Sequence, residues 1–204
     1  GLPLIVVDSN VDAFYGVPLG FQQTHTPRNA SVALLLQGGL GRFLYASTYA
    51  RADAFVGATY DMAYSDTVAM PLLSTGSLEA VSTGGEHTRV EKTLQIADIQ
   101  TSYRALDVCA RGDAAGNCSA CAKCLRTLLT LEIAGVVERY AAAFDLAVYR
   151  RERDQYCGTV LRSKAPLNRE IVAFAARRGF RFPLLKALET ALSNLQEPAM
   201  PADP

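Results

Sequence analysis

The sequence predicts an α/β protein in which a buried sheet is joined to a helical C-terminal extension through a four-cysteine metal site. Short apolar runs end in acidic or hydroxyl residues, as the buried strands of an α/β sheet do. Four of the five cysteines lie within residues 109–124, and helical periodicity dominates the chain after them. The elements behind this prediction follow in chain order.

The first apolar run, Leu4 to Val7, predicts a strand buried on both faces, with Asp8 and Asn10 just beyond its carboxyl end. Ligands of open α/β sheets bind at such strand ends, so Asp8 and Asn10 are candidates to bind a ribose or a substrate hydroxyl. A turn followed by a helix cap is an equally good interpretation. Because a buried-type strand opens a chain without an initiator Met, we expect a fragment, a processed form or an incomplete sequence.

Residues 11–28 are predicted to be irregular, because no period survives in them. His25 is therefore interpreted as a surface or hydrogen-bonded loop residue rather than a catalyst. Asn29 can cap a helix that is expected over residues 30–37 and that ends at a glycine pair.

A second buried strand is predicted over residues 42–47, and Ser47 at its end is a further cofactor-binding candidate. Residues 49–77 show no period and predict a long loop, followed by a short strand over 78–82. The loop either lines a site for a small polar substrate or is a surface lid without specific contacts. Its aromatic and acidic residues are Tyr49, Asp53, Tyr60, Asp61, Tyr64 and Asp66.

A capping box, Thr88 with Glu91, predicts the start of a helix that runs to residue 97. Arg89 and Lys92 share one side of its first turn. A pair of cations there suits a phosphate group, and an ordinary solvated helix face is the alternative interpretation. A cofactor-binding role for these two residues therefore stays open at this point.

A third strand, predicted over residues 104–109, leads into the pattern Cys-x8-Cys-x2-Cys-x2-Cys. Zn²⁺ takes four thiolates at tetrahedral corners, and each Cys-x2-Cys step turns two sulfurs the same way. Because protein would occupy all four positions, such a zinc ion is structural rather than catalytic. The predicted ligands are Cys109, Cys118, Cys121 and Cys124.

The cysteine pattern allows three other interpretations. Two disulfides are typical of much shorter secreted chains, and a redox pair leaves two cysteines unexplained. An iron–sulfur cluster is the serious alternative, since four cysteines also hold one. Cys157 is expected to be a buried or spectator thiol.

Helical periodicity follows the cysteines. A helix from residue 125 to Gly135 would begin beside the last ligand, where its dipole favours thiolate charge. Further helices are expected over 136–146, 167–176 and 183–195, with a disordered tail over 197–204.

Composition excludes several partners. The formal net charge is zero, so the basic surface that nucleic-acid binding needs is missing, as is a cationic face for membranes. No apolar run approaches the ~20 residues of a membrane span, and no signal peptide is present. Cysteines in metal spacing suit a reducing compartment, so a cytoplasmic location is expected.

A family resemblance rests on the cysteine motif. The segment Asn117-Cys-Ser-Ala-Cys-Ala-Lys-Cys-Leu-Arg-Thr is similar to the Asn-Cys-Gly-x-Cys-x-Lys-Cys-Leu-Arg-Thr segment of an uncharacterised branch of the PP-loop ATP pyrophosphatase, or adenine nucleotide alpha-hydrolase-like, superfamily. With Pro71 to Leu73 and Thr88 to Lys92 before it, the pattern resembles the C-terminal half of 7-cyano-7-deazaguanine synthase.

The resemblance implies a Rossmann-like doubly wound parallel sheet with a structural zinc, over residues 1–135, followed by the helical extension 136–196. It implies ATP with Mg²⁺ as cofactor, adenylation of a small-molecule carboxylate or amide with release of pyrophosphate, and displacement of AMP by a nucleophile. Arg89 and Lys92 then become phosphate candidates near the nucleotide.

One departure is large. The superfamily's Ser-Gly-Gly-x-Asp-Ser phosphate loop is missing, so the chain looks as if its first strand and PP-loop lie upstream of Gly1. The alternative function is a non-catalytic, zinc-stabilised binding subunit on the same scaffold. A homo-oligomer, a missing N-terminal segment or a partner chain would then complete the sheet.

Overall fold

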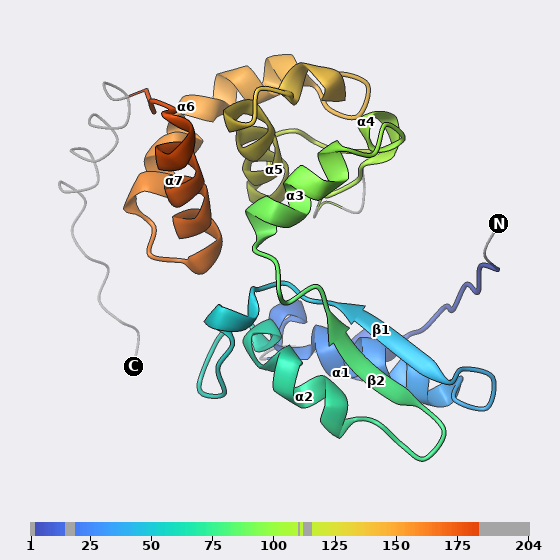
Figure 1. The fold of residues 1–204 in the computed structure, drawn as a ribbon. Helices are drawn as coiled ribbons and strands as arrows, with labels where there is room; N and C mark the ends of the chain where they lie inside the picture. Colours follow the sequence, from blue (N-terminus) through green and yellow to red (C-terminus); the bar gives the residue numbers. More distant parts are fainter. Residues whose placement is uncertain (1–2, 15–18, 110, 112–115, 184–204) are drawn as a thin grey trace. The chain divides into compact units, whose positions relative to one another are not determined.

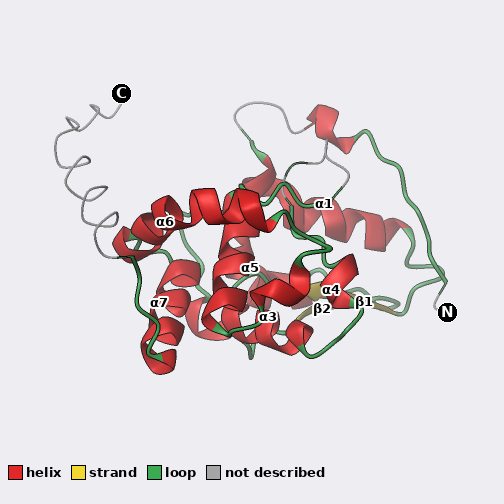
Figure 2. Cartoon of the chain, turned by 90° about the horizontal axis from the view of Figure 1, so that it is seen from above, coloured by secondary structure: helices red, strands yellow, loops and turns green. Residues whose placement is uncertain are grey.

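The structure, a computed structural model, describes residues 3–14, 19–109, 111 and 116–183. The chain divides into two compact units, Gly1–His87 and Thr88–Pro204, each described here by itself. In its described part the protein is mixed α/β, with helices throughout and one two-stranded parallel sheet (Figures 1 and 2). Among these residues, no helix is both long and apolar enough to cross a bilayer.

The first unit contains a parallel β–α–β arrangement preceded by a long helix (Figure 1). Strands β1 and β2 pair in parallel, with Leu44 opposite Val81, and helix α2 packs against β2. The elements are α1 (Phe21–Leu35), β1 (Arg42–Ala46), α2 (Asp66–Leu72) and β2 (Glu79–Thr83), with 3-10 turns at Val11–Phe14, Arg51–Asp53 and Met62–Ser65.

The sheet of the first unit has one covered face. Phe43 and Tyr45 of β1 are half-buried, whereas Arg42, Leu44 and Ala46 on the opposite face are exposed. Parallel sheets are usually covered on both faces. The described residues form only two paired strands, so the doubly wound sheet that the family resemblance implies stays a prediction.

The predicted strand at Leu4 to Val7 is wrong. This segment is extended but pairs with no strand, and Leu4 is 86% exposed. Its apolar composition suits a buried strand, but composition cannot supply the backbone partner that a strand requires.

Residues 21–28 were expected to be irregular but are helical, because α1 begins at Phe21 and continues through Pro27 rather than starting at residue 30. The Gly20 amide donates to the Gln23 side chain (3.3 Å), which closes the first turn. The predicted strands at 42–47 and 78–82 are confirmed as β1 and β2, but β1 is exposed on one face and is not the buried strand that was expected. The intervening residues, predicted to be an aperiodic loop, contain α2, which is too short to show a clear period.

The second unit is built from helices around one apolar cluster. Leu128, Leu129 and Ile171 lie at its centre without exposed surface. The helices are α3 (Arg89–Ala97), α4 (Ser102–Ala105), α5 (Ala122–Ile133), α6 (Leu146–Arg162) and α7 (Pro166–Arg178), with a 3-10 turn at Val137–Tyr140.

In the second unit, the helix start that a capping box predicted was accurate. The capping box of α3 is confirmed: the Thr88 hydroxyl accepts from the Glu91 amide (3.1 Å), and the Glu91 carboxylate accepts from the Thr88 amide (2.7 Å). Helices α5 and α7 are also confirmed, and α7 ends at Gly179 in the left-handed conformation (φ 64°).

Other predictions for the second unit were wrong. The expected strand at 104–109 is the end of α4 followed by unpaired chain, and the expected helix at 136–146 is a 3-10 turn and further turns. Helix α6 was not recognised from its highly charged sequence. Its buried side includes Leu146, Tyr149, Tyr156, Cys157 and Val160.

The domain boundary at residue 135 was predicted from the family resemblance and stays a prediction. The contacts within the structure divide the chain into two compact units that meet between residues 87 and 88. The cysteines and the helices after them therefore belong to the same unit. Apart from residue 183, the expected helix at 183–195 and tail at 197–204 lie outside the described residues.

Candidate metal centre

The four cysteines of the predicted site converge. Their sulfur atoms all lie within 4.8 Å of one another, with Cys124 Sγ 3.5 Å from Cys121 Sγ and 4.0 Å from Cys118 Sγ. Four thiolates around one Zn²⁺ at about 2.3 Å stand roughly 3.8 Å apart at tetrahedral corners. The cluster, completed by Cys109, can therefore hold a single metal ion.

The disulfide interpretation does not fit. All five cysteines of the chain are free, and the spacings between sulfurs are well above the ~2.05 Å of a disulfide bond. Cys157 is fully buried in the apolar cluster of the second unit, and burial raises the pKa of its thiol to about 11. It is a packing residue, as expected.

Local backbone geometry places the sulfurs. Cys121 is the N-cap of α5 and Cys124 lies in its first turn, so both point from the start of one helix. Between Cys118 and Cys121, Ser119 adopts a positive φ of 57°, the one described non-glycine residue to do so. This left-handed residue reverses the chain tightly enough for the Cys121 amide to donate to Cys118 Sγ (3.3 Å).

The surroundings of the sulfurs favour thiolate charge. Four thiolates on a divalent ion leave two excess negative charges, which backbone amides and the positive end of α5 offset. Hydrogen bonds from the backbone amides of Cys118 and Arg111 lower the pKa of the Cys109 thiol, whereas burial raises the pKa of Cys124. Because the thiolate is the form that binds a metal, binding displaces the proton of each thiol that is still protonated.

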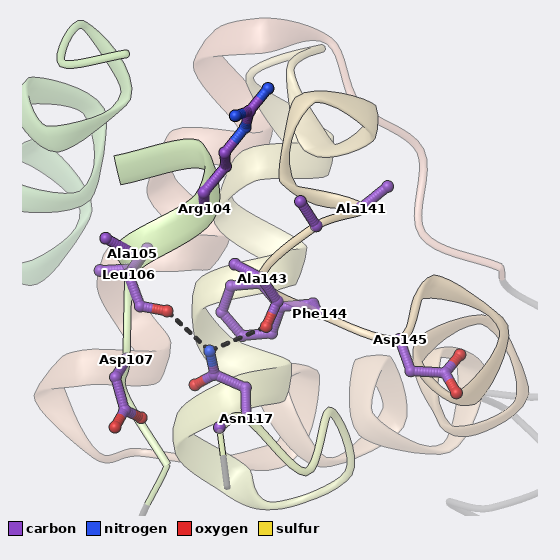
Figure 3. Close-up of a pocket in the computed structure, with 11 residues that line it drawn as sticks. Arg104, Ala105, Leu106, Asp107, Asn117, Ala141, Ala143, Phe144 and Asp145 are labelled. Atoms are coloured by element: carbon purple, nitrogen blue, oxygen red, sulfur yellow. Dashed lines mark hydrogen bonds between the residues drawn. The ribbon is translucent and has the colours of Figure 1, made fainter. Parts of the chain in front are cut away.

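The lining of a polar cavity of about 510 Å³ includes Asn117, which directly precedes Cys118 in the chain (Figure 3). It is formed by three segments of the second unit, 104–107, 116–117 and 141–145. Arg104, Asp107 and Asp145 supply its charged side chains. Asp145 is also the N-cap of α6, since its carboxylate accepts from the amides of Ala147 (2.9 Å) and Val148 (3.0 Å).

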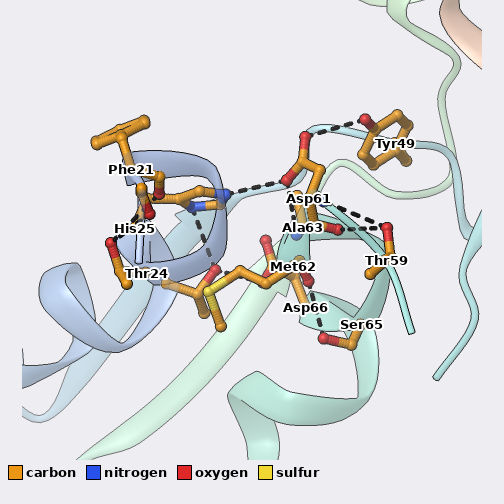
Figure 4. Close-up of polar contacts among 12 residues, drawn as sticks. Phe21, Thr24, His25, Tyr49, Thr59, Asp61, Met62, Ala63, Ser65 and Asp66 are labelled. Carbon is orange, nitrogen blue, oxygen red and sulfur yellow. Dashed lines mark hydrogen bonds and ion pairs between the residues drawn. The ribbon is translucent and has the colours of Figure 1, made fainter. Parts of the chain in front are cut away.

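The first unit contains a polar cluster that sequence reasoning missed, centred on His25 (Figure 4). His25 is only 6% exposed. Its Nε2 lies 3.2 Å from a carboxylate oxygen of Asp61, and its Nδ1 lies 2.9 Å from the Tyr45 hydroxyl. A carboxylate only accepts hydrogen bonds, so the Nε2–H of His25 donates to Asp61.

The pKa values of the two carboxylates in this cluster, Asp61 and Asp66, are shifted in opposite directions. Burial raises the pKa of Asp61, but hydrogen bonds, first that of His25, outweigh burial and lower it. Asp66 is 1% exposed and accepts a hydrogen bond from the Thr26 hydroxyl (2.6 Å). Burial raises its pKa. Tyr49, Asp61 and Asp66 were predicted to lie in a long loop. In the structure their hydrogen bonds join α1, β1 and the chain around the start of α2 into a polar core.

No sequence signal could have identified this cluster as a unit. Tyr45 lies 20 residues and Asp61 lies 36 residues after His25 in the chain. Tyr49, whose hydroxyl donates to Asp61 (3.0 Å), stacks on Tyr64 at 3.8 Å between ring centres. Only the paired strands and the packing of α1 bring these side chains together.

The five predicted cofactor-binding residues lie in different segments. Asp8 and Asn10 are exposed in the extended chain before α1. Ser47 follows β1, is largely buried, and its amide donates to Thr83 of the neighbouring strand (2.8 Å). Arg89 and Lys92 are half-buried in the first turn of α3, in the other unit. Their assignment to a nucleotide site stays a prediction.

Comparison of the chain with protein families, with curated proteins and with solved structures found no match. The resemblance to the PP-loop superfamily therefore depends on the cysteine motif and its flanking residues alone. The property that the geometry itself supports is the capacity of four thiols to hold a metal ion.

Proposed function

We propose that Cys109, Cys118, Cys121 and Cys124 bind one structural Zn²⁺ ion. The observation that carries this proposal is the convergence of the four sulfurs within 4.8 Å of one another. Thiolates are soft ligands that suit zinc in a tetrahedral site. The close spacing favours a single ion over an iron–sulfur cluster, because several iron atoms between the sulfurs would hold them further apart.

Metal analysis of the purified protein tests this proposal. We expect one zinc per chain and a colourless protein. Replacement of zinc by Co²⁺ should produce the intense visible bands of tetrahedral thiolate coordination. Iron with inorganic sulfide, or a protein that takes up no metal after reduction and zinc addition, would contradict the assignment.

A zinc ion with four protein ligands has no free position for water or substrate, so it stabilises the fold and does no chemistry. Binding of structural zinc contributes on the order of 10 kcal/mol to the folding of its surroundings. In this chain the ion would join the segment before Cys109 to the start of α5, whose other side packs in the apolar cluster of the second unit.

We further propose that the natural protein is an ATP-dependent adenylating enzyme that acts on a small-molecule carboxylate or amide and releases AMP and pyrophosphate. The cysteine motif, the parallel pairing of β1 and β2, and hydroxyl residues at the ends of both strands support this proposal. Ser47 would contribute a hydroxyl group at the strand ends. Separately, in the second unit, the family resemblance makes Arg89 and Lys92 in the first turn of α3 candidates to bind phosphate.

The proposal applies to a chain that carries a glycine-serine phosphate loop upstream of Gly1. Such a chain should release pyrophosphate from ATP when its substrate is present. Lys92→Ala should raise the KM for ATP by about tenfold, the loss of one charge-assisted phosphate contact. Lys164→Ala, an exposed residue between α6 and α7, is the matched control and should leave the KM unchanged. A natural chain without a phosphate loop would contradict this activity.

A second candidate function, a non-catalytic binding subunit, is favoured by the apolar surface of the first unit. Leu44 on the open face of the sheet is 60% exposed and Leu72 at the end of α2 is 79% exposed. Contiguous exposed apolar patches are typical of surfaces that contact other proteins, and these two leucines would belong to such a patch. Size-exclusion chromatography with and without ATP separates the candidates, since a binding subunit should associate with its partner regardless of nucleotide.

A further inference from the structure

The side chain of Asn117 makes three hydrogen bonds, each to the main chain of another segment. Its Nδ2 donates to the carbonyl oxygens of Leu106 (2.7 Å) and Ala143 (3.0 Å), as Figure 3 shows. Its Oδ1 accepts from the amide of Val108 (2.9 Å). Both Nδ2–H donors and the Oδ1 acceptor of the Asn117 side chain are therefore hydrogen-bonded.

These bonds connect residues that are adjacent to metal ligands. Asn117 directly precedes Cys118, and Val108 directly precedes Cys109. One side chain therefore holds together the two segments that deliver the first and second ligands. Its Oδ1 also lies 3.9 Å from Cys124 Sγ, so the same group contacts the ligand at the start of α5.

We infer that Asn117 is a positioning residue of the metal centre, which holds the Cys109 segment against the turn at Cys118 before the ion binds. This inference rests on the proposed zinc site. Cys109 and Cys118 are the most widely separated neighbours among the four ligands, so closing the chain between them costs the most conformational entropy. Hydrogen bonds that already fix both ends reduce the entropy lost on metal binding. Supporting contacts of this kind typically change metal affinity 10- to 100-fold.

The structure also provides a matched control. Ser119, on the other side of Cys118, accepts a hydrogen bond from the Asp145 amide (2.9 Å). Asn117 and Ser119 thus both fasten the turn at residues 143–145 to the cysteine segment. Only Asn117 also reaches the segment before Cys109, so removal of the Ser119 hydroxyl should cost stability without loosening the ligands from each other.

The experiment measures zinc affinity of the whole chain by competition with a chromogenic chelator, for wild type, Asn117→Ala and Ser119→Ala. We expect Asn117→Ala to weaken zinc binding 10- to 100-fold, while Ser119→Ala stays within about threefold of wild type. The Co²⁺ spectrum of Asn117→Ala should still report four thiolates, because all ligands remain.

Melting temperatures of the metal-free and zinc-loaded forms separate positioning from general support. A merely structural residue would lower both temperatures equally, whereas Asn117→Ala should lower that of the loaded form more. Wild-type zinc affinity in Asn117→Ala, or equal weakening in Ser119→Ala, would overturn the inference.

If Asn117→Ala does not fold with saturating zinc, Asn117→Ser provides the same comparison, since its short hydroxyl cannot bridge the two carbonyls. Failure of both variants to fold would also overturn the inference, because Asn117 would then support the whole unit. The proposed zinc site fails separately, if wild type itself binds no zinc.

Discussion

The two units of the chain are stabilised by different means. The second unit buries large side chains, among them Leu128, Leu129, Tyr140 and Ile171, in one cluster that includes the cysteine ligand Cys124. The buried apolar residues of the first unit are mostly alanines, beside Met70 and Leu78, and its buried polar residues form a hydrogen-bonded network around His25.

The two units also differ in the number of large apolar side chains that they expose. Among the described large apolar residues that are exposed, all except Ile99 and Leu161 lie between residues 4 and 72. Burial of apolar area contributes roughly 25 cal/mol per Å², whereas a hydrogen bond has a net value of about 1 kcal/mol. Apolar packing therefore dominates in the second unit, where the proposed zinc ion would add to it, and polar contacts dominate in the first.

Removal of the metal is the perturbation with the largest expected effect. Chelation of the zinc-loaded protein should destabilise the second unit by on the order of 10 kcal/mol at neutral pH. Hydrogen exchange should then accelerate around residues 106–133, while amides of β1 and β2 keep their protection. Equal loss of protection in both units would break the comparison, since the first unit would then depend on the metal as well.

Truncation of the apolar core comes second. Leu128→Ala removes a fully buried side chain and should lower the free energy of unfolding by about 2–5 kcal/mol. Leu44→Ala, on the open face of β1, is the control and should change it by less than about 0.5 kcal/mol. Urea unfolding measures both. A loss at Leu44 as large as at Leu128 would show that the open face of the sheet is covered in solution.

The polar network of the first unit should respond to His25→Ala. This substitution leaves the buried groups of Tyr45 and Asp61 without their shared partner, at an expected cost of about 1–3 kcal/mol. His87→Ala, a partly exposed histidine, serves as control. Thermal unfolding monitored separately in each unit should locate the loss in the first. Unchanged stability in His25→Ala would remove the polar network from the comparison.

The smallest effect concerns the pH dependence that Asp66 confers. Because its pKa is raised in the folded state, its contribution to stability is complete below the unfolded value of about 3.9 and is lost as pH rises through the folded pKa. Asp66→Asn should therefore flatten the decline of stability above that pH. Asp61 has the opposite sign, because its folded pKa is lowered.

Urea unfolding from pH 3 to pH 7 tests this difference in sign. Wild type should lose stability as pH falls through the folded pKa of Asp61. Asp61→Asn has no carboxylate to protonate at this position, so it should not show that loss. A pH profile of Asp66→Asn that matches wild type would contradict the proposed role of its buried carboxyl.

The sequence by itself determined the local features of this protein. The cysteine spacing identified four side chains that do converge, the capping box identified the start of α3, and a short apolar run and an alternating pattern identified β1 and β2. Each of these signals depends on residues a few positions apart, whose relative geometry the backbone limits to a few conformations.

Only the tertiary structure decided which distant groups meet. The apolar segment at Leu4 to Val7 has strand composition but no strand partner, and the segment before Cys109 pairs with the Asn117 side chain rather than with a sheet. His25 belongs to a buried network because Tyr45 and Asp61, far along the chain, reach it. Such contacts are set by the packing of whole elements, whose energy is the sum of many nonlocal interactions, and no short stretch of sequence encodes that sum.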